Sequence, residues 1–231
     1  MQISMDALNY VYFGFPLDEA LYGRLTDLIA RIQHNPEARG LSRDAATVVT
    51  DLLNVAIRAF YYDVMDAVPT HPSTRKSADA GVGTVAKGTQ LVIQKMVTTL
   101  DANDLTVFAN YMQTLLIPQG NHFFLAYPLT AQQKQSLEQV MLKIQEDPNT
   151  ENYNHLIVEA LCALTDQAIK YFYDTPTRLI QVRSFIRKSA DLAVRTVCKG
   201  MHFVIKQLFR RTRQKELKLF SNYLQQQLVY R

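Results

Sequence analysis

Two stretches of the chain decide its fold because each of them occurs twice. Residues 9–17 read NYVYFGFPL and residues 121–129 read NHFFLAYPL, while RKSAD stands at residues 75–79 and again at residues 187–191. A shift of 112 positions aligns residues 9–119 with residues 121–231 without a gap, and 30 of these 111 positions are identical. Chance would give about six or seven identities at ordinary amino-acid frequencies. The fixed spacing predicts a tandem duplication, with a first repeat at residues 1–119 and a second at residues 120–231.

Each repeat carries four segments with the apolar spacing of an amphipathic helix. In the first repeat they cover residues 18–35, 42–64, 73–100 and 104–116. Asp18 and its counterpart Thr130 are suitable N-caps, and Gln133 follows Thr130 at the spacing of a capping box. In the second repeat, Thr175 and Pro176 predict that the third helix starts near Pro176. No strong run of period-two alternation is found, so the sequence predicts an all-α fold of two pseudo-symmetric four-helix bundles.

Two segments and one helix face complete the predicted organisation. Residues 9–15 are too short and too aromatic to assign, and residues 117–126 are expected to form a short loop that brings the bundles into contact. The third helix carries a stripe of small residues in both repeats: Ser77, Gly81, Thr84 and Gly88, matched by Ser189, Ala193, Thr196 and Gly200. Small residues at this spacing let a second helix approach closely. We therefore expect the third helix to be central and contacted on two sides.

The composition is that of a folded, non-secreted protein. Hydrophobic residues make up 48% of the 231 positions and charged residues 20%, which excludes a disordered chain. Cys162 and Cys198 are not part of a C-x-x-C pair, and unclustered cysteines are typical of a reducing compartment. We find neither a signal-peptide pattern nor an apolar run long enough for a transmembrane helix. The sequence predicts a cytoplasmic protein.

Positive charge is concentrated in the second repeat. Residues 1–119 carry nine Lys and Arg and twelve Asp and Glu, a net charge of −3, so residues 120–231 carry the remaining +7. Seven basic side chains fall within about 80° of arc on the third helix of the second repeat, over about 38 Å if that helix is continuous. We call these residues the basic stripe: Lys188, Arg195, Lys199, His202, Lys206, Arg210 and Arg213. The first repeat has only Lys76 and Lys87 at the matching positions.

The basic stripe motivates the first functional hypothesis, a non-catalytic binding protein whose stripe contacts an anionic partner. Nucleic acid, an anionic lipid surface and an acidic protein all fit this charge. A solvated helix face, or packing against the acidic first repeat, would give the same pattern. The alternative hypothesis is a carrier or sensor of a small apolar ligand held between helices, which the dense aromatic residues suggest.

Other residue groups give weaker indications of a site. Arg75, Lys76, Asp79 and Lys87 recur as Arg187, Lys188, Asp191 and Lys199, and we interpret them mainly as ion pairs on a helix face. His155 and Glu159 have metal-ligand spacing, with Asp166 as a third ligand, but the first repeat lacks the set, so no metal site is predicted. Neither a phosphate-binding loop nor any catalytic motif is found. The sequence therefore favours a protein without cofactor or catalysis and leaves its oligomeric state open.

Overall fold

The computed structural model describes residues 11–67, 72–146, 154–181, 184–209 and 214–230. The first half of the chain contributes α1 (Glu19–His34), α2 (Leu41–Ile57), α3 (Asp63–Ala67), α4 (Pro72–Val97) and α5 (Ala102–Thr114). The second half contributes α6 (Ala131–Glu146), α7 (Asn154–Ile169), α8 (Thr175–Leu179), α9 (Ser184–Phe209) and α10 (Gln214–Gln226). The prediction of a mostly helical protein is confirmed, whereas the prediction that it is all-α is wrong.

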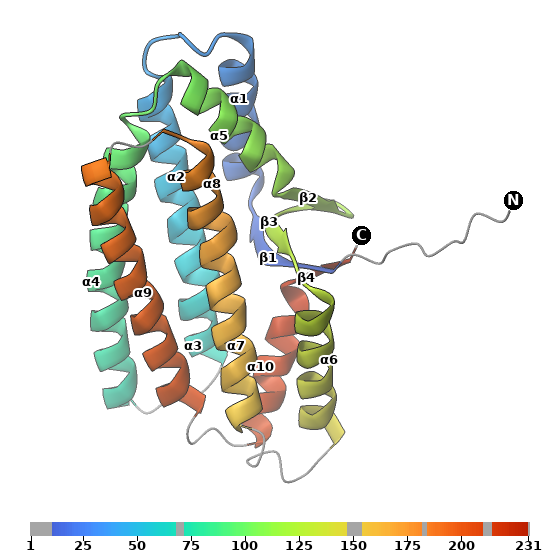
Figure 1. Ribbon diagram of the computed structural model, residues 1–231. Coiled ribbons are helices and arrows are strands. Elements are labelled where there is room, and N and C mark those ends of the chain that lie inside the picture. Colours follow the sequence, from blue (N-terminus) through green and yellow to red (C-terminus); the bar gives the residue numbers. More distant parts are fainter. Residues whose placement is uncertain (1–10, 68–71, 147–153, 182–183, 210–213, 231) are drawn as a thin grey trace, which may run out of the picture.

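A four-stranded antiparallel sheet lies at one side of the helices (Figure 1). Its strand order is β2-β3-β1-β4, formed by Leu116–Gln119, His122–Pro128, Val11–Leu17 and Leu228–Tyr230. The segment expected to be a loop, residues 117–126, is instead most of the β2–β3 hairpin. Gly120 turns this hairpin with φ at 60°, in the left-handed region that favours glycine.

The sheet was not predicted from the sequence because its central strands are apolar on both faces. In β1, Val11, Phe13, Phe15 and Leu17 are buried, and so is Gly14 between them. In β3, residues 124–127 are all buried. Strands covered on both faces lack the alternation of apolar and polar residues that marks a half-exposed strand.

The predicted helix starts at Asp18 and Thr130 are confirmed. The Asp18 carboxylate accepts a hydrogen bond from the Leu21 amide at 2.7 Å. Thr130 and Gln133 form the reciprocal capping box: the Gln133 amide donates to the Thr130 hydroxyl at 3.2 Å, and the Thr130 amide donates to Gln133 Oε1 at 3.0 Å. The predicted start near Pro176 is wrong, because Pro176 belongs to α8, which ends at Leu179 before α9 begins at Ser184.

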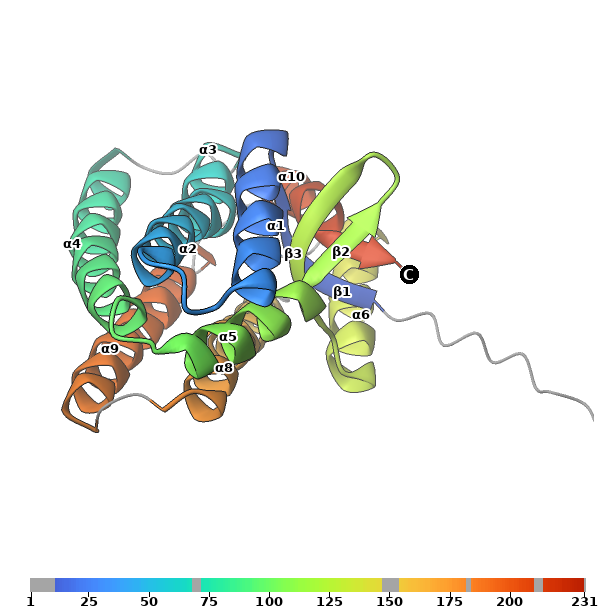
Figure 2. The ribbon, with the colours of Figure 1, turned by 90° about the horizontal axis from the view of Figure 1, so that it is seen from above.

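Helices α4 and α9 form the outer layer of the molecule, on the side away from the sheet (Figures 1 and 2). Each is contacted on two sides, since α4 packs on α9 and α2, and α9 packs on α4 and α7. The expected close approach along the small residues is absent, because a methyl group added at Gly81, Gly88 or Gly200 would meet no atom within 4 Å. The third helix of each half is therefore peripheral and not central as expected. Of its small residues, Gly81, Thr84, Gly88, Ser189 and Thr196 are exposed.

Two π-helical segments connect the two halves of the chain. They are η1 (Arg58–Tyr62), which continues α2, and η3 (Lys170–Asp174), which continues α7. A π-turn displaces backbone carbonyls from the regular helical pattern, and here two of them accept tyrosine hydroxyls. Tyr111 donates to the Tyr171 carbonyl at 2.7 Å, and Tyr223 donates to the Ala59 carbonyl.

The buried cores also mix both halves. One core combines α1, α2 and α5 with Tyr173, Ile180 and Val194, and a second combines α6, α7 and α10 with Val11 and Phe13 of β1. The predicted boundary between residues 119 and 120 falls in the β2–β3 turn. The division into two repeats stays a prediction.

Candidate functional site

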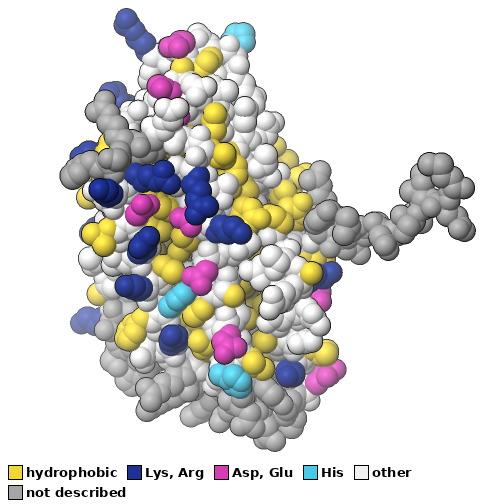
Figure 3. All heavy atoms as spheres, viewed as in Figure 1, with side chains coloured by type: hydrophobic (Ala, Val, Ile, Leu, Met, Phe, Trp, Pro, Cys, Tyr) yellow, Lys and Arg dark blue, Asp and Glu magenta, His cyan; other side chains and the backbone are white. Residues whose placement is uncertain are grey.

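Four members of the basic stripe lie on the exposed face of α9: Lys188, Arg195, Lys199 and Lys206. Lys and Arg side chains gather over this part of the molecule, with a few Asp and Glu side chains beside them (Figure 3). Among the described residues, none of the four cations lies within 4.0 Å of a carboxylate oxygen.

Two large apolar side chains are exposed among these cations. Leu192 is 69% exposed and Phe203 is 63% exposed. At 100° per residue, they share an arc of about 80° with the four cations. On the neighbouring helix α4, Leu91 is also 69% exposed. The outer face of α9 is thus both basic and apolar.

The other three members of the basic stripe differ from these four. Arg210 and Arg213 lie outside the described residues. His202 is only 26% exposed, and its Nε2 lies 3.0 Å from Asp166 Oδ1 on α7. The structure therefore places His202 at the α7–α9 contact and not on the open face.

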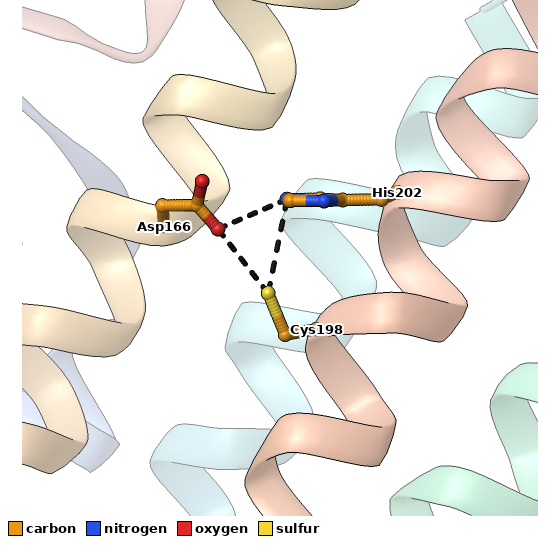
Figure 4. A group of neighbouring side chains, drawn as sticks. All are labelled: Asp166, Cys198 and His202. Carbon is orange, nitrogen blue, oxygen red and sulfur yellow. Dashed lines mark hydrogen bonds and ion pairs between the residues drawn. The ribbon is translucent and has the colours of Figure 1, made fainter.

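A second cluster is formed at that contact by Asp166, Cys198 and His202 (Figure 4). The Cys198 thiol donates a hydrogen bond to Asp166 Oδ1 at 3.2 Å, and its sulfur lies 3.7 Å from His202 Nε2. Cys198 and His202 are one helical turn apart on α9. This i, i+4 spacing was visible in the sequence, but only the fold brings Asp166 to the pair.

The cluster does not have the arrangement of a nucleophilic cysteine site. In such a site the thiol and the carboxylate contact opposite nitrogens of the imidazole, whereas here both approach His202 Nε2. Burial, with the hydrogen bond to Asp166, raises the pKa of the Cys198 thiol to about 11. A reactive cysteine requires the opposite shift.

Three members of the recurring polar set, Arg75, Asp79 and Asp191, form structural contacts. Arg75 lies 2.5 Å from Asp66 and 3.8 Å from Asp79, so the predicted i, i+4 pair is present. Asp79 also accepts a hydrogen bond from the Tyr61 hydroxyl at 2.9 Å.

In the second half the corresponding contact is between Tyr173 and Asp191, at 2.8 Å. Among the described ion pairs, none joins Arg187 to Asp191. His155 and Glu159 are exposed and do not belong to the metal-type cluster that contains Asp166.

An apolar cavity of about 110 Å³ lies between η1, α7, α9 and α10. Six aromatic residues line it, together with one buried amide: Phe13, Phe60, Tyr61, Phe209, Phe220, Tyr223 and Gln227. The Gln227 side chain is 5% exposed, and its Oε1 accepts no hydrogen bond from the described residues. The cavity therefore has apolar walls with one buried amide side chain among its lining residues.

Comparisons with protein families, with curated proteins and with solved structures give no match to this chain. In the described part of the chain, no helix has both the length and the apolar character of a membrane span. The surface of α9, the cluster of Asp166, Cys198 and His202 between α7 and α9, and the cavity are the three candidate sites of the described residues.

Proposed function

We propose that this protein is a non-catalytic binding protein and that the face of α9 contacts an anionic lipid surface. The observation that carries the proposal is the combination of four exposed cations, which form no ion pair within the described residues, with two exposed apolar side chains on one helix face. Its residues are Lys188, Leu192, Arg195, Lys199, Phe203 and Lys206.

A lipid surface fits this combination better than a nucleic acid or an acidic protein. At a membrane interface, Lys and Arg contact the anionic headgroups while Leu and Phe enter the boundary with the acyl chains. Each Lys or Arg near such a surface contributes about 1 kcal/mol. Phosphates alone would use the cations and leave Leu192 and Phe203 in water.

The test measures co-sedimentation of the protein with lipid vesicles. We expect binding to vesicles of phosphatidylcholine with phosphatidylserine and none to phosphatidylcholine alone. Raising the salt to 1 M shortens the screening length to about 3 Å and should weaken the binding strongly. Equal affinity for both vesicle types would overturn the proposal. Retention of nucleic acid or of an acidic peptide, without vesicle binding, would replace it with that partner.

The cavity supports a second candidate function, a carrier or sensor of a small apolar ligand. A cavity of about 150 Å³ in another protein binds benzene, so 110 Å³ suits a ligand of similar or smaller size. Gln227 Oε1, which accepts no hydrogen bond within the described residues, favours a ligand that also has one hydrogen-bond donor, because a donor there would satisfy a buried polar atom.

Phenol is a suitable probe for this second function because it combines an aromatic ring with one donor. We expect phenol to raise the unfolding temperature more than benzene does, since ligands that bind the native state stabilise it. Gln227→Leu should remove the difference between the two probes. If neither phenol nor benzene raises the unfolding temperature, the cavity is excluded as a ligand site.

We also propose that the chain arose by the tandem duplication indicated by its sequence. Support comes from element bounds that recur after 112 residues: α1 with α6, η1 with η3, α3 with α8, α4 with α9, and α5 with α10. The sheet register agrees, because Gly14 pairs with Ala126, its own counterpart. Separately expressed halves that assemble into the same fold would support this origin further.

A further inference from the structure

The α7–α9 cluster has the ligand spacing of a tetrahedral metal site. Asp166 Oδ1 lies 3.0 Å from His202 Nε2 and 3.2 Å from Cys198 Sγ, and this sulfur lies 3.7 Å from His202 Nε2 (Figure 4). Tetrahedral zinc with bonds of about 2.0–2.1 Å to nitrogen and oxygen and 2.3 Å to sulfur sets its ligand atoms about 3.3–3.6 Å apart. Shifts of a few tenths of an ångström would convert the observed cluster into a coordination shell.

We propose that Asp166, Cys198 and His202 bind a divalent transition metal of the zinc class between α7 and α9. Thiolate, imidazole and carboxylate are the three ligand types that zinc uses in proteins. The site is reached from solvent, because the Asp166 side chain is 59% exposed and that of His202 is 26% exposed.

Cys162 is the candidate we propose for a fourth ligand, on the basis of its spacing along α7. It precedes Asp166 by one turn of α7, as Cys198 precedes His202 by one turn of α9. Cys162 is not in a disulfide, and it lies outside the group of three whose ligand atoms are within 4.8 Å of one another. Asp166, Cys198 and His202 thus supply three ligands, and Cys162 is the candidate for the fourth position of a tetrahedral set.

The first half of the chain shows that helix packing does not require these side chains. The positions 112 residues earlier hold Thr50, Asn54, Ala86 and Gln90. There the Gln90 amide donates to Asn54 Oδ1 at 2.5 Å and joins α2 to α4. In the second half, all four positions hold residues that can ligate a metal. A neutral amide pair is enough to bridge the helices, so the change of all four points to a ligand.

The first experiment titrates Co²⁺, as a spectroscopic substitute for Zn²⁺, into protein freed of metal with a chelator. We expect one Co²⁺ per chain, intense visible bands of a tetrahedral ion and an absorption band from charge transfer between thiolate and metal. The Cys198 thiol loses its proton to solvent when the bond to the metal forms. Added Zn²⁺ should remove these bands. Absence of the charge-transfer band at one equivalent of Co²⁺ would overturn the proposal.

A variant of the second half that carries the residues of the first half at the matching positions is the matched control. The triple variant Asp166→Asn, Cys198→Ala, His202→Gln should fold, because its side chains equal the Asn54–Ala86–Gln90 set that already bridges α2 and α4. It should lose the charge-transfer band, and Zn²⁺ should no longer raise its unfolding temperature. Co²⁺ bands that persist in the folded triple variant would place the metal elsewhere and contradict the assignment.

The variant Cys162→Ser tests the fourth ligand separately. If Cys162 ligates the metal, its loss should reduce the charge-transfer band by about half, since one of the two thiolates is removed, and should weaken Zn²⁺ binding. An unchanged spectrum and affinity would contradict the role of Cys162. Vesicle binding, measured in parallel with the triple variant, should be retained, because the four exposed cations of α9 are untouched.

Discussion

Gly14 lies directly opposite Ala126 where β1 pairs with β3, and a methyl group built on Gly14 would lie 2.5 Å from the Ala126 side chain. The same methyl group would also collide with the backbone carbonyl of Leu125. Backbone atoms cannot move aside without breaking the hydrogen bonds between the strands, so only glycine fits at this close approach of β1 to β3. Because β1 contributes Phe13 to one core and Phe15 to the other, the pairing of β1 with β3 also holds these two cores together.

We predict that Gly14→Val lowers the free energy of unfolding by at least about 3 kcal/mol, the upper range for overpacking of a filled site. Urea unfolding followed by circular dichroism measures it. Gly23→Ala is the matched control, because Gly23 is exposed inside α1 and its added methyl group meets nothing within 4 Å. That control should gain about 0.5–1 kcal/mol from helix propensity. A valine variant as stable as wild type would show that β1 and β3 do not approach each other closely at Gly14.

Removal of one tyrosine hydroxyl at a π-helical carbonyl should weaken the contact between the halves. Tyr111→Phe leaves the carbonyl of Tyr171 without its partner, and Tyr223→Phe does the same to Ala59. Each change should cost about 1–2 kcal/mol of unfolding free energy. Tyr230→Phe, at an exposed side chain, should change it by less than about 0.5 kcal/mol. Equal effects at all three positions would contradict this account of the π-helical segments.

Alkaline pH should destabilise the protein through Tyr61 and Tyr173. Burial, followed by hydrogen bonds to Asp79 and Asp191, raises the pKa of both phenols well above the ordinary value of about 10. Below pH 10 both states keep these protons and the stabilisation is complete. Above pH 10 the unfolded chain loses protons that the folded chain keeps, so the unfolding free energy falls as pH rises.

Urea midpoints measured between pH 9 and pH 11 check this prediction. The double variant Tyr61→Phe, Tyr173→Phe should be less stable at neutral pH, and its stability should fall less steeply above pH 10. A slope equal to that of wild type would show that these two phenols do not titrate with raised pKa values.

The helical part of the fold was predictable because amphipathic helices leave a strong pattern in sequence. Leu21, Leu25 and Ile32 recur at helical spacing and are all buried in α1, and the caps at Asp18 and Thr130 use local chemistry. The sheet was not predictable in this way, because β1 and β3 pair across more than 100 residues and are covered on both faces. Long-range pairing of continuously apolar segments leaves no local signal.

The candidate sites show the same difference between local patterns, which the sequence reveals, and long-range packing, which it does not. The cations of α9 belong to one helix, so their shared face follows from 100° per residue. The α7–α9 cluster depends on how two helices pack, whereas local spacing alone groups Asp166 with His155 and Glu159 on α7. The i, i+4 pairs Cys162–Asp166 and Cys198–His202 were present in the sequence, but no local rule joins one pair to the other.

The central claim, that the face of α9 binds an anionic lipid surface, is tested most directly by charge reversal. We would measure vesicle affinity for Lys199→Glu, Lys206→Glu and for a matched control on α10, Lys215→Glu, Lys218→Glu, which changes net charge by the same amount at exposed positions. The account predicts a loss of at least about 30-fold for the α9 variant, equivalent to two contacts of about 1 kcal/mol each, and a much smaller loss for the control. Equal losses in the two variants would contradict it, because they would show that net charge, and not the face of α9, determines binding.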